Sequence, residues 1–406
     1  MIAGTPVLDL DDAASLEAAD TGGALRSAAS GGAQVRATAA AVSEDTLAHL
    51  TDLRPRSVVL VSGAGRATRA AGLLVATLGD HASLPIVPVT ALPPWVGPLD
   101  VVLVSGDDSG DPRLIDAVDR ALRRGAEVVV AAPHEGPLRT VMAGRAALLE
   151  PRVQVLGHNR LLRFLAAGIA VLRAVDPIRT GGAVPELTEL ADRLDAEALR
   201  DGPRNEVFHN PAKTLAARMQ QRSVVLAGDS PAATVLAGHS AEVLCQSSGK
   251  LATAVDLAEA IAAKDRLVEA AGGAAPDFDP LFHDEELDGP APVERVQIFV
   301  LSADRDRAAA RRRIAVFGGN RTGLVDADLV DTDTDADVAD ADMNLLDTQI
   351  TDSAPARGTA TAPEYNTELE QLAVLALRLE MAAAYLQLIG FGATTTDDQG
   401  QYGGNY

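Results

Sequence analysis

Residues 100–133 read DVVLVSGDDSGDPRLIDAVDRALRRGAEVVVAAP, and this stretch decides the fold class. Its two ends, Val101–Val104 and Glu127–Ala132, are apolar runs typical of strands buried on both faces of a parallel sheet. The segment between them predicts an amphipathic helix, because apolar side chains recur at helical spacing at Leu114, Ile115, Val118 and Leu122. Ligands of open α/β sheets bind at the carboxyl ends of the strands. The loop Ser105–Asp111 is therefore the first place to expect a ligand.

The composition of the whole chain limits the possible functions. With 406 residues, of which 47% are hydrophobic, the chain is long enough for two globular domains. Its net charge of −22 argues against nucleic acid and anionic membranes as partners, because both need a basic surface. No apolar run approaches the roughly 20 residues of a membrane span and the N-terminus lacks the features of a signal peptide, so we expect a cytoplasmic protein. The single cysteine, Cys245, excludes an intrachain disulfide and argues against a cysteine-based zinc site.

The first half of the chain alternates between predicted strands and helices, which is the pattern of a doubly wound parallel sheet. A strand at Ser57–Val61 is followed by the glycine turn Ser62–Arg66 and an alanine-rich helix. This order is typical of a phosphate-binding unit, although a tight turn without a ligand is an equal alternative. The other elements predicted here are two short outer helices within Leu8–Val42, strands at Leu84–Val89 and Val153–Leu156, and a helix at Leu161–Ala174.

A proline- and glycine-rich stretch, 176–204, interrupts the alternation, and we predict that it links an N-terminal domain, 1–175, to a C-terminal domain, 205–392. The second half repeats the rhythm, with strands at Ser223–Ala227, Ala241–Cys245 and Val296–Leu301 and helices at Thr253–Ala271 and Arg305–Val316. A final helix within Pro363–Phe391 is expected to pack on the core. The acidic segment 330–352 reads as a long loop and 393–406 as a flexible tail. The predicted fold class is α/β, with two doubly wound parallel sheets and a C-terminal helix.

Several short segments follow one another in a characteristic order over nearly the whole chain. They are Gly63-Ala64-Gly65, the strand, loop and helix from Asp100, Asn210–Ala216, Arg222–Gly228, Gly249-Lys250 and Tyr385-Leu386. In order and spacing they resemble the sugar isomerase (SIS) fold. Within it, the chain is most similar to the bifunctional phosphoglucose/phosphomannose isomerases, especially a divergent actinobacterial branch.

The resemblance implies two SIS domains with flavodoxin-like sheets, a homodimer and a site for a phosphorylated hexose. Enzymes of this family interconvert aldose and ketose phosphates without a metal or another cofactor. A glutamate moves a proton between C1 and C2 of the sugar, a histidine helps to open the ring, and cations stabilise the enediolate. The ligand-binding residues that the resemblance implies are Ser62, Gly63, Gly65, Arg66, Ser105, Gly106, Ser109, Arg160 and Lys250.

The loop that should hold the phosphate differs from the family pattern. The family reads roughly Ser-Tyr-Ser-Gly-Asn-Thr, whereas residues 106–111 read Gly-Asp-Asp-Ser-Gly-Asp. Two like charges about 4 Å apart repel by roughly 4 kcal/mol at an effective dielectric near 20, so this loop disfavours a dianion. Asp111 before Pro112 is also the pattern of a helix N-cap. Asp107 and Asp108 are predicted to be solvated turn residues, with a magnesium site as the lesser alternative.

Two residues are candidates for the catalytic groups. Glu259 lies within one residue of the position that the family gives to its glutamate, but the surrounding Asn-His-Asn core is absent and an exposed helical residue is the alternative. His283 lies in the loop that replaces this motif and is otherwise a surface histidine. Lys213 is expected to face solvent at the start of a helix, and His239 to lie either in the core or in the cleft.

Two functions follow from these residues. The first is a sugar-phosphate-binding SIS protein with degenerate catalytic residues, acting as a sensor or as a non-catalytic partner. The second is an active aldose-ketose isomerase that converts glucose 6-phosphate or mannose 6-phosphate to fructose 6-phosphate. We favour the first, because the phosphate-loop hydroxyls, the Glu/His motif and a C-terminal lysine are all missing together.

Overall fold

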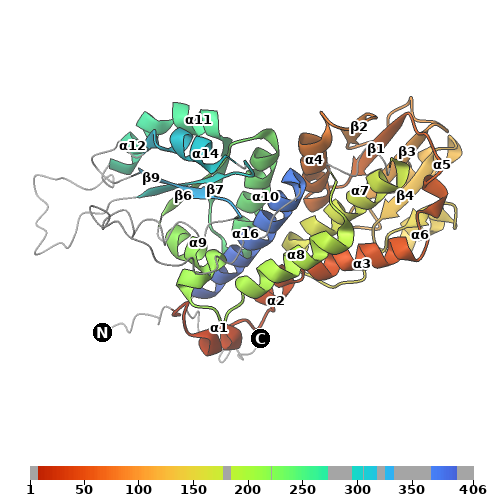
Figure 1. The fold of residues 1–406 in the computed structure, drawn as a ribbon. Coiled ribbons are helices and arrows are strands. Elements are labelled where there is room, and N and C mark those ends of the chain that lie inside the picture. The colour runs from red at the N-terminus through yellow and green to blue at the C-terminus, as the bar shows by residue number, and fades with distance from the viewer. Residues whose placement is uncertain are drawn as a thin grey trace, which may run out of the picture.

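The computed structural model describes residues 8–176, 184–220, 222–272, 295–304, 306–317, 325–332 and 367–390 (Figure 1). The predictions for His283, for the tail 393–406 and for nearly all of the acidic segment 330–352 therefore fall outside the described residues.

The first sheet, which we call sheet A, contains five parallel strands in the order β2-β1-β3-β4-β5. The two central strands, β1 (Ser57–Ser62) and β3 (Asp100–Ser105), are buried along their whole length, as their apolar runs predict. The remaining strands are β2 (Ile86–Val89), β4 (Glu127–Ala131) and β5 (Ala147–Leu148). Helices α5 (Pro112–Arg123) and α6 (Gly136–Met142) cover one face of the sheet, and α4 (Arg66–Leu78) and α7 (Leu161–Val175) cover the other.

The second sheet, sheet B, contains four parallel strands in the order β7-β6-β8-β9. The strands are β6 (Ser223–Gly228), β7 (Ala252–Asp256), β8 (Val296–Leu301) and β9 (Val325–Val330). One face packs on α11 (Leu257–Ala262), α12 (Lys264–Gly272) and α14 (Arg307–Ile314). The other face joins the large core that it shares with sheet A, through α9 (Pro211–Met219) and α10 (Pro231–Ser248).

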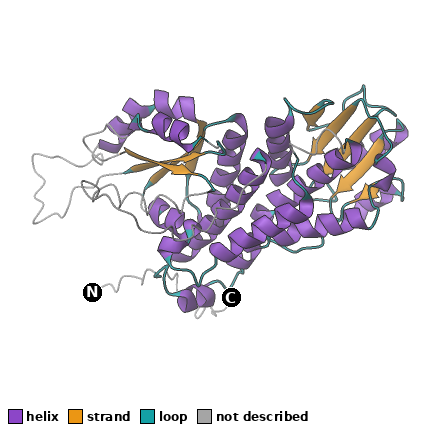
Figure 2. Ribbon diagram, in the orientation of Figure 1, coloured by secondary structure: helices purple, strands orange, loops and turns teal. Residues whose placement is uncertain are grey.

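The C-terminal helix, α16 (Glu368–Gly390), runs through the centre of the molecule between the two sheets. Figure 2 shows it among the helices that fill this space. It is long and apolar enough to cross a membrane, but 94% of its most apolar 18-residue stretch is buried inside the protein. It packs on α8 (Leu187–Arg200), α9 and α10, so the predicted core helix is confirmed.

Helices α4 and α10 join the two sheets and run antiparallel to each other. Arg66, at the start of α4, binds Glu242 and Gln246 near the end of α10. Gly72, further along α4, faces Val235 in the first half of α10. Because α4 follows β1 and α10 follows β6, the carboxyl edges of the two sheets lie at opposite ends of this helix pair. The 13 residues of α4 span about 20 Å along this pair.

Three predicted elements are wrong. The strand predicted at Ala241–Cys245 is part of α10, because a short apolar run does not distinguish a strand from a buried helix. The start of the helix predicted at Thr253–Ala271 is strand β7. Residues 153–156 do not form a strand; the edge strand of sheet A is instead β5.

The strand β9 was not predicted. Its sequence VDADLV carries two aspartates, which hide the apolar alternation, and these acids pair with Arg218 of α9 and with Arg222, which directly precedes β6.

The N-terminal helices α2 (Ala24–Ala29) and α3 (Gly31–Ser43) are also not outer helices as predicted. A side chain at Gly31 would meet Leu162 and Leu377 at 2.5 and 2.7 Å, so this glycine permits close packing of α3 on α7 and α16.

Candidate functional site

The carboxyl edge of sheet A brings together the two loops that the sequence singles out. After β1 the chain turns at Gly63 and Gly65, and the backbone N–H of Gly63 donates to the carbonyl of Ser105 at 2.9 Å. Gly65 has φ +73°, a conformation that favours glycine. Ser62 and Ser105 are buried at the ends of β1 and β3. The turns that carry these predicted ligand-binding residues and Gly106 therefore lie side by side where the strand order of the sheet reverses.

The three aspartates of the loop 106–111 have different partners. Asp111 is the N-cap of α5, as predicted, and accepts a hydrogen bond from the backbone N–H of Arg113 at 2.9 Å. The hydrogen-bonded Arg113 side chain also lowers the pKa of the Asp111 carboxyl. Asp108 is exposed and folds back on the loop, where its Oδ1 accepts from the Gly110 N–H at 2.7 Å. These hydrogen bonds join Asp108 and Asp111 to residues two positions away in the chain.

Asp107 instead contacts two arginines that follow the 3-10 helix η2 (Gly157–Asn159). The Nη1 of Arg160 lies 2.9 Å from Asp107 Oδ1, and Arg163 Nη2 donates to the same oxygen. The Arg163 side chain is only 12% exposed, and this burial lowers its pKa. Arg163 was missed by the sequence analysis. Its signal was the helical i, i+3 spacing from Arg160, which places both guanidinium groups on one side of the first turn of α7.

A buried polar cluster behind these loops ties sheet A to the helices of sheet B. Arg66 is 3% exposed and donates to Glu242 at 2.7 Å and to Gln246 at 3.0 Å. On the other side of the cluster, Glu380 of α16 accepts from Asn159 Nδ2 at 2.9 Å. Arg66 is thus held by α10 in this structure, and its main effect is to fix the start of α4 beside the glycine turn.

His239 connects the two halves of this cluster, and its partners define its tautomer. Its Nδ1 lies 3.2 Å from Arg66 Nη1, and its Nε2 lies 2.9 Å from Glu380 Oε1. A guanidinium can only donate, so Nδ1 accepts and the proton of a neutral imidazole sits on Nε2, which donates to the carboxylate. Burial lowers the pKa of His239, and the carboxylate of Glu380 opposes this only in part. The structure therefore places His239 in the core, as a neutral side chain.

We expect acid to weaken the fold through His239. A histidine whose pKa is lower when folded than its usual 6.5 contributes stability above pH 6.5, and this contribution is lost as the pH falls toward the folded pKa. The loss is at most about 1.4 kcal/mol per pH unit. The stability difference between the wild type and His239→Gln should therefore shrink from pH 8 to pH 5, as measured by urea unfolding. A constant difference would contradict the neutral, buried assignment.

A second histidine, His158, lies half-buried beside Arg160. Burial lowers its pKa, whereas the charge of Glu380 raises it. His158 was not predicted, because nothing in the local pattern Gly157-His158-Asn159 reveals the nearby charge of Glu380 in α16.

The other predicted residues lie elsewhere. Lys250 follows α10 and therefore lies at the same end of the α4–α10 pair as the loops of sheet A, where its Nζ donates to the Gln220 carbonyl at 3.3 Å. Glu259 is exposed in the first turn of α11, at the carboxyl edge of sheet B and hence at the other end of that pair. Lys213 is buried rather than solvent-facing, because its Nζ donates to the carbonyls of Pro203 and Asn205 at 2.8 and 2.7 Å.

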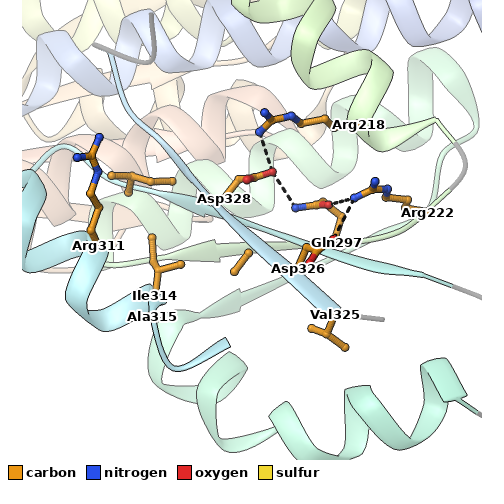
Figure 3. Close-up of a pocket in the computed structure, with 11 residues that line it drawn as sticks. Arg218, Arg222, Gln297, Arg311, Ile314, Ala315, Val325, Asp326 and Asp328 are labelled. Carbon is orange, nitrogen blue, oxygen red and sulfur yellow. Dashed lines mark hydrogen bonds and ion pairs between the residues drawn. The ribbon is translucent and has the colours of Figure 1, made fainter. Parts of the chain in front are cut away.

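An open groove of about 560 Å³ lies away from these loops, along the edge strand β9 (Figure 3). Its polar residues largely satisfy one another: Arg218 pairs with Asp328 at 2.9 Å, and Gln297 donates to the same carboxylate at 2.8 Å. Arg222 binds the amide oxygen of Gln297. The groove therefore carries no converging set of unsatisfied groups among its described residues, and we place the candidate site at the loops of sheet A.

In the part of the chain that the structure describes, no group of three or more histidine, cysteine, aspartate or glutamate side chains is arranged to hold a metal ion.

Comparison with known proteins finds similarity in structure alone. No family model matches the sequence, and no curated protein matches it. Tagatose-6-phosphate ketose/aldose isomerase from Escherichia coli superposes with a TM-score of 0.55 at 13% identity, covering 93% of this chain and 96% of that chain. A candidate phosphosugar isomerase from Silicibacter pomeroyi gives 0.55 at 13%, covering 89% and 96%. The C-terminal domain of glucosamine-fructose-6-phosphate aminotransferase from Francisella tularensis gives 0.51 at 9%, covering 88% and 95%.

These similarities extend over nearly the full length of both chains in each comparison. The chain therefore has the two-sheet α/β fold of solved phosphosugar isomerases.

Proposed function

We propose that this protein binds a phosphorylated hexose at the carboxyl edge of sheet A and acts as a sensor or as a non-catalytic partner. The observation that carries the proposal is the convergence of Arg160 and Arg163 on the loop after β3. Two guanidinium groups beside a strand-to-helix loop suit a phosphate monoester, which carries about −1.5 to −2 charges at pH 7. The fold of solved sugar-phosphate enzymes supports this choice of ligand class.

The position of Glu259 supports a protein without isomerase activity. A general base must come within about 3 Å of the proton that it removes. Glu259 lies at the opposite end of α10 from the loops of sheet A, so it does not reach a sugar bound there within the same chain. The relationship to phosphoglucose/phosphomannose isomerases and a cytoplasmic homodimer belong to this proposal as well.

We expect glucose 6-phosphate, mannose 6-phosphate or fructose 6-phosphate to raise the melting temperature, and glucose not to. A ligand at 100 times its Kd stabilises the native state by about 2.7 kcal/mol. In a coupled assay the wild type should interconvert these phosphates no faster than a reaction without protein. Turnover above that blank would instead support an active isomerase, and the absence of any shift with all three phosphates would contradict the proposed ligand.

A further inference from the structure

The two arginines of the candidate site already hold an anion, and that anion belongs to the chain itself. Both guanidinium groups contact one atom, Asp107 Oδ1. The carboxylate therefore takes the position, relative to Arg160 and Arg163, that one oxygen of an incoming oxyanion would need. Asp107 and a phosphate cannot both occupy this position.

The buried character of Arg163 makes this contact more than a surface ion pair. Its side chain is 12% exposed and its guanidinium carbon lies 4.4 Å from the ring centroid of Phe164, so water solvates it poorly. A cation in such a place needs a counter-ion, whereas an exposed pair contributes little. The neighbouring acids do not supply it, because Asp108 is bonded to Gly110 and Asp111 to Arg113.

We propose that Asp107 is a tethered counter-ion that occupies the anion site when no ligand is bound and that a phosphate group must displace. With Asp107 in place, the three side chains carry a net charge of +1, and with it turned away the two arginines present +2, which matches a phosphate dianion. The wild-type protein therefore binds phosphate more weakly than the arginine pair alone would.

This inference concerns the anion site and rests on the proposed function only for the sugar. The probe is inorganic phosphate, titrated calorimetrically into the wild type, Asp107→Asn and Asp108→Asn at constant ionic strength. Asp107→Asn should bind phosphate about 10- to 100-fold more tightly than the wild type. Asp108→Asn removes the same charge from the same loop without touching the arginines, and should change affinity less than about threefold.

Two further variants keep the result interpretable. Asp107→Ser removes the carboxylate with a smaller side chain, and it should show the same gain if Asp107→Asn folds poorly. Adding Arg163→Gln to either variant should abolish the gain. Equal phosphate affinities for the wild type and both Asp107 variants, or an equal gain in Asp108→Asn, would overturn the inference.

The same titrations with glucose 6-phosphate separate this inference from the proposed function. If the Asp107 variants gain phosphate affinity but bind glucose 6-phosphate no better than phosphate, the tethered counter-ion stands and the sugar ligand fails. If the wild type and the Asp107 variants bind glucose 6-phosphate equally well, the sugar ligand stands and the tethered counter-ion fails.

Discussion

Replacing Arg378 with methionine is expected to lower the free energy of unfolding by about 3–5 kcal/mol. Arg378 lies fully buried in α16, and its Nε donates to Glu197 of α8 at 2.6 Å. Its Nη1 and Nη2 donate to the carbonyls of Asp331 and Thr332, which directly follow β9, at 2.5 and 3.3 Å. The substitution would remove the cation that pairs with the buried Glu197 carboxylate. It would also remove the donor that the two backbone carbonyls share. Chemical denaturation measures the loss directly.

Two variants show whether the loss comes from the buried charge. Arg204→Met makes the same substitution in an exposed pair with Glu17, where side chains are 84% and 49% exposed, and should cost less than about 1 kcal/mol. Glu197→Gln in the Arg378→Met background should recover at least about 1 kcal/mol relative to the sum of the single changes. Similar losses in Arg378→Met and Arg204→Met would show that α16 is not held by this contact.

Replacing Gly228 with alanine is the second change expected to have a large effect. A Cβ at Gly228 would lie 2.1 Å from the backbone nitrogen of Thr234 and 2.5 Å from the carbonyl carbon of Ala233. These are backbone atoms of the first turn of α10, so no side-chain rotation relieves the clash. The turn must move away from β6, and we expect a loss of about 3 kcal/mol or more.

The glycine that follows β1 provides the matched control. At Gly63 the nearest atom to an added Cβ is the carbonyl oxygen of Ser105 at 3.6 Å, an ordinary contact. Gly63→Ala should therefore change the free energy of unfolding by less than about 0.5 kcal/mol. If Gly63→Ala and Gly228→Ala unfold at the same denaturant concentration, the close approach of α10 to β6 does not limit stability.

The strands of the sheets that are buried on both faces could be predicted from their sequence. Val101–Val104 and Val224–Ala227 are apolar without interruption, which is typical of strands in a parallel sheet covered on both faces. Strand β9 was not predicted, because its aspartates interrupt the apolar pattern. Asp328 is stabilised in the strand by Arg218 and Gln297, which belong to other elements. Local pattern carries no information about such distant partners.

In the candidate site, too, contacts between sequence neighbours could be predicted and contacts between distant residues could not. The cap at Asp111 is a contact between neighbours in sequence, and the pattern Asp-Pro was enough to predict it. The pairing of Asp107 with Arg163 joins residues 56 positions apart, and the burial of Arg66 depends on the antiparallel packing of α4 on α10. The sequence could therefore identify the loops, but not which distant residues pair with their charged side chains.

The most direct test of the proposed ligand site is a structure of the wild-type protein with fructose 6-phosphate bound. The account predicts the phosphate beside the loop 106–111, with oxygens bonded to Arg160 and Arg163 and the Asp107 carboxylate turned away from both. A phosphate seated in the groove along β9, or at the carboxyl edge of sheet B, with Asp107 still bonded to its arginines, would contradict it.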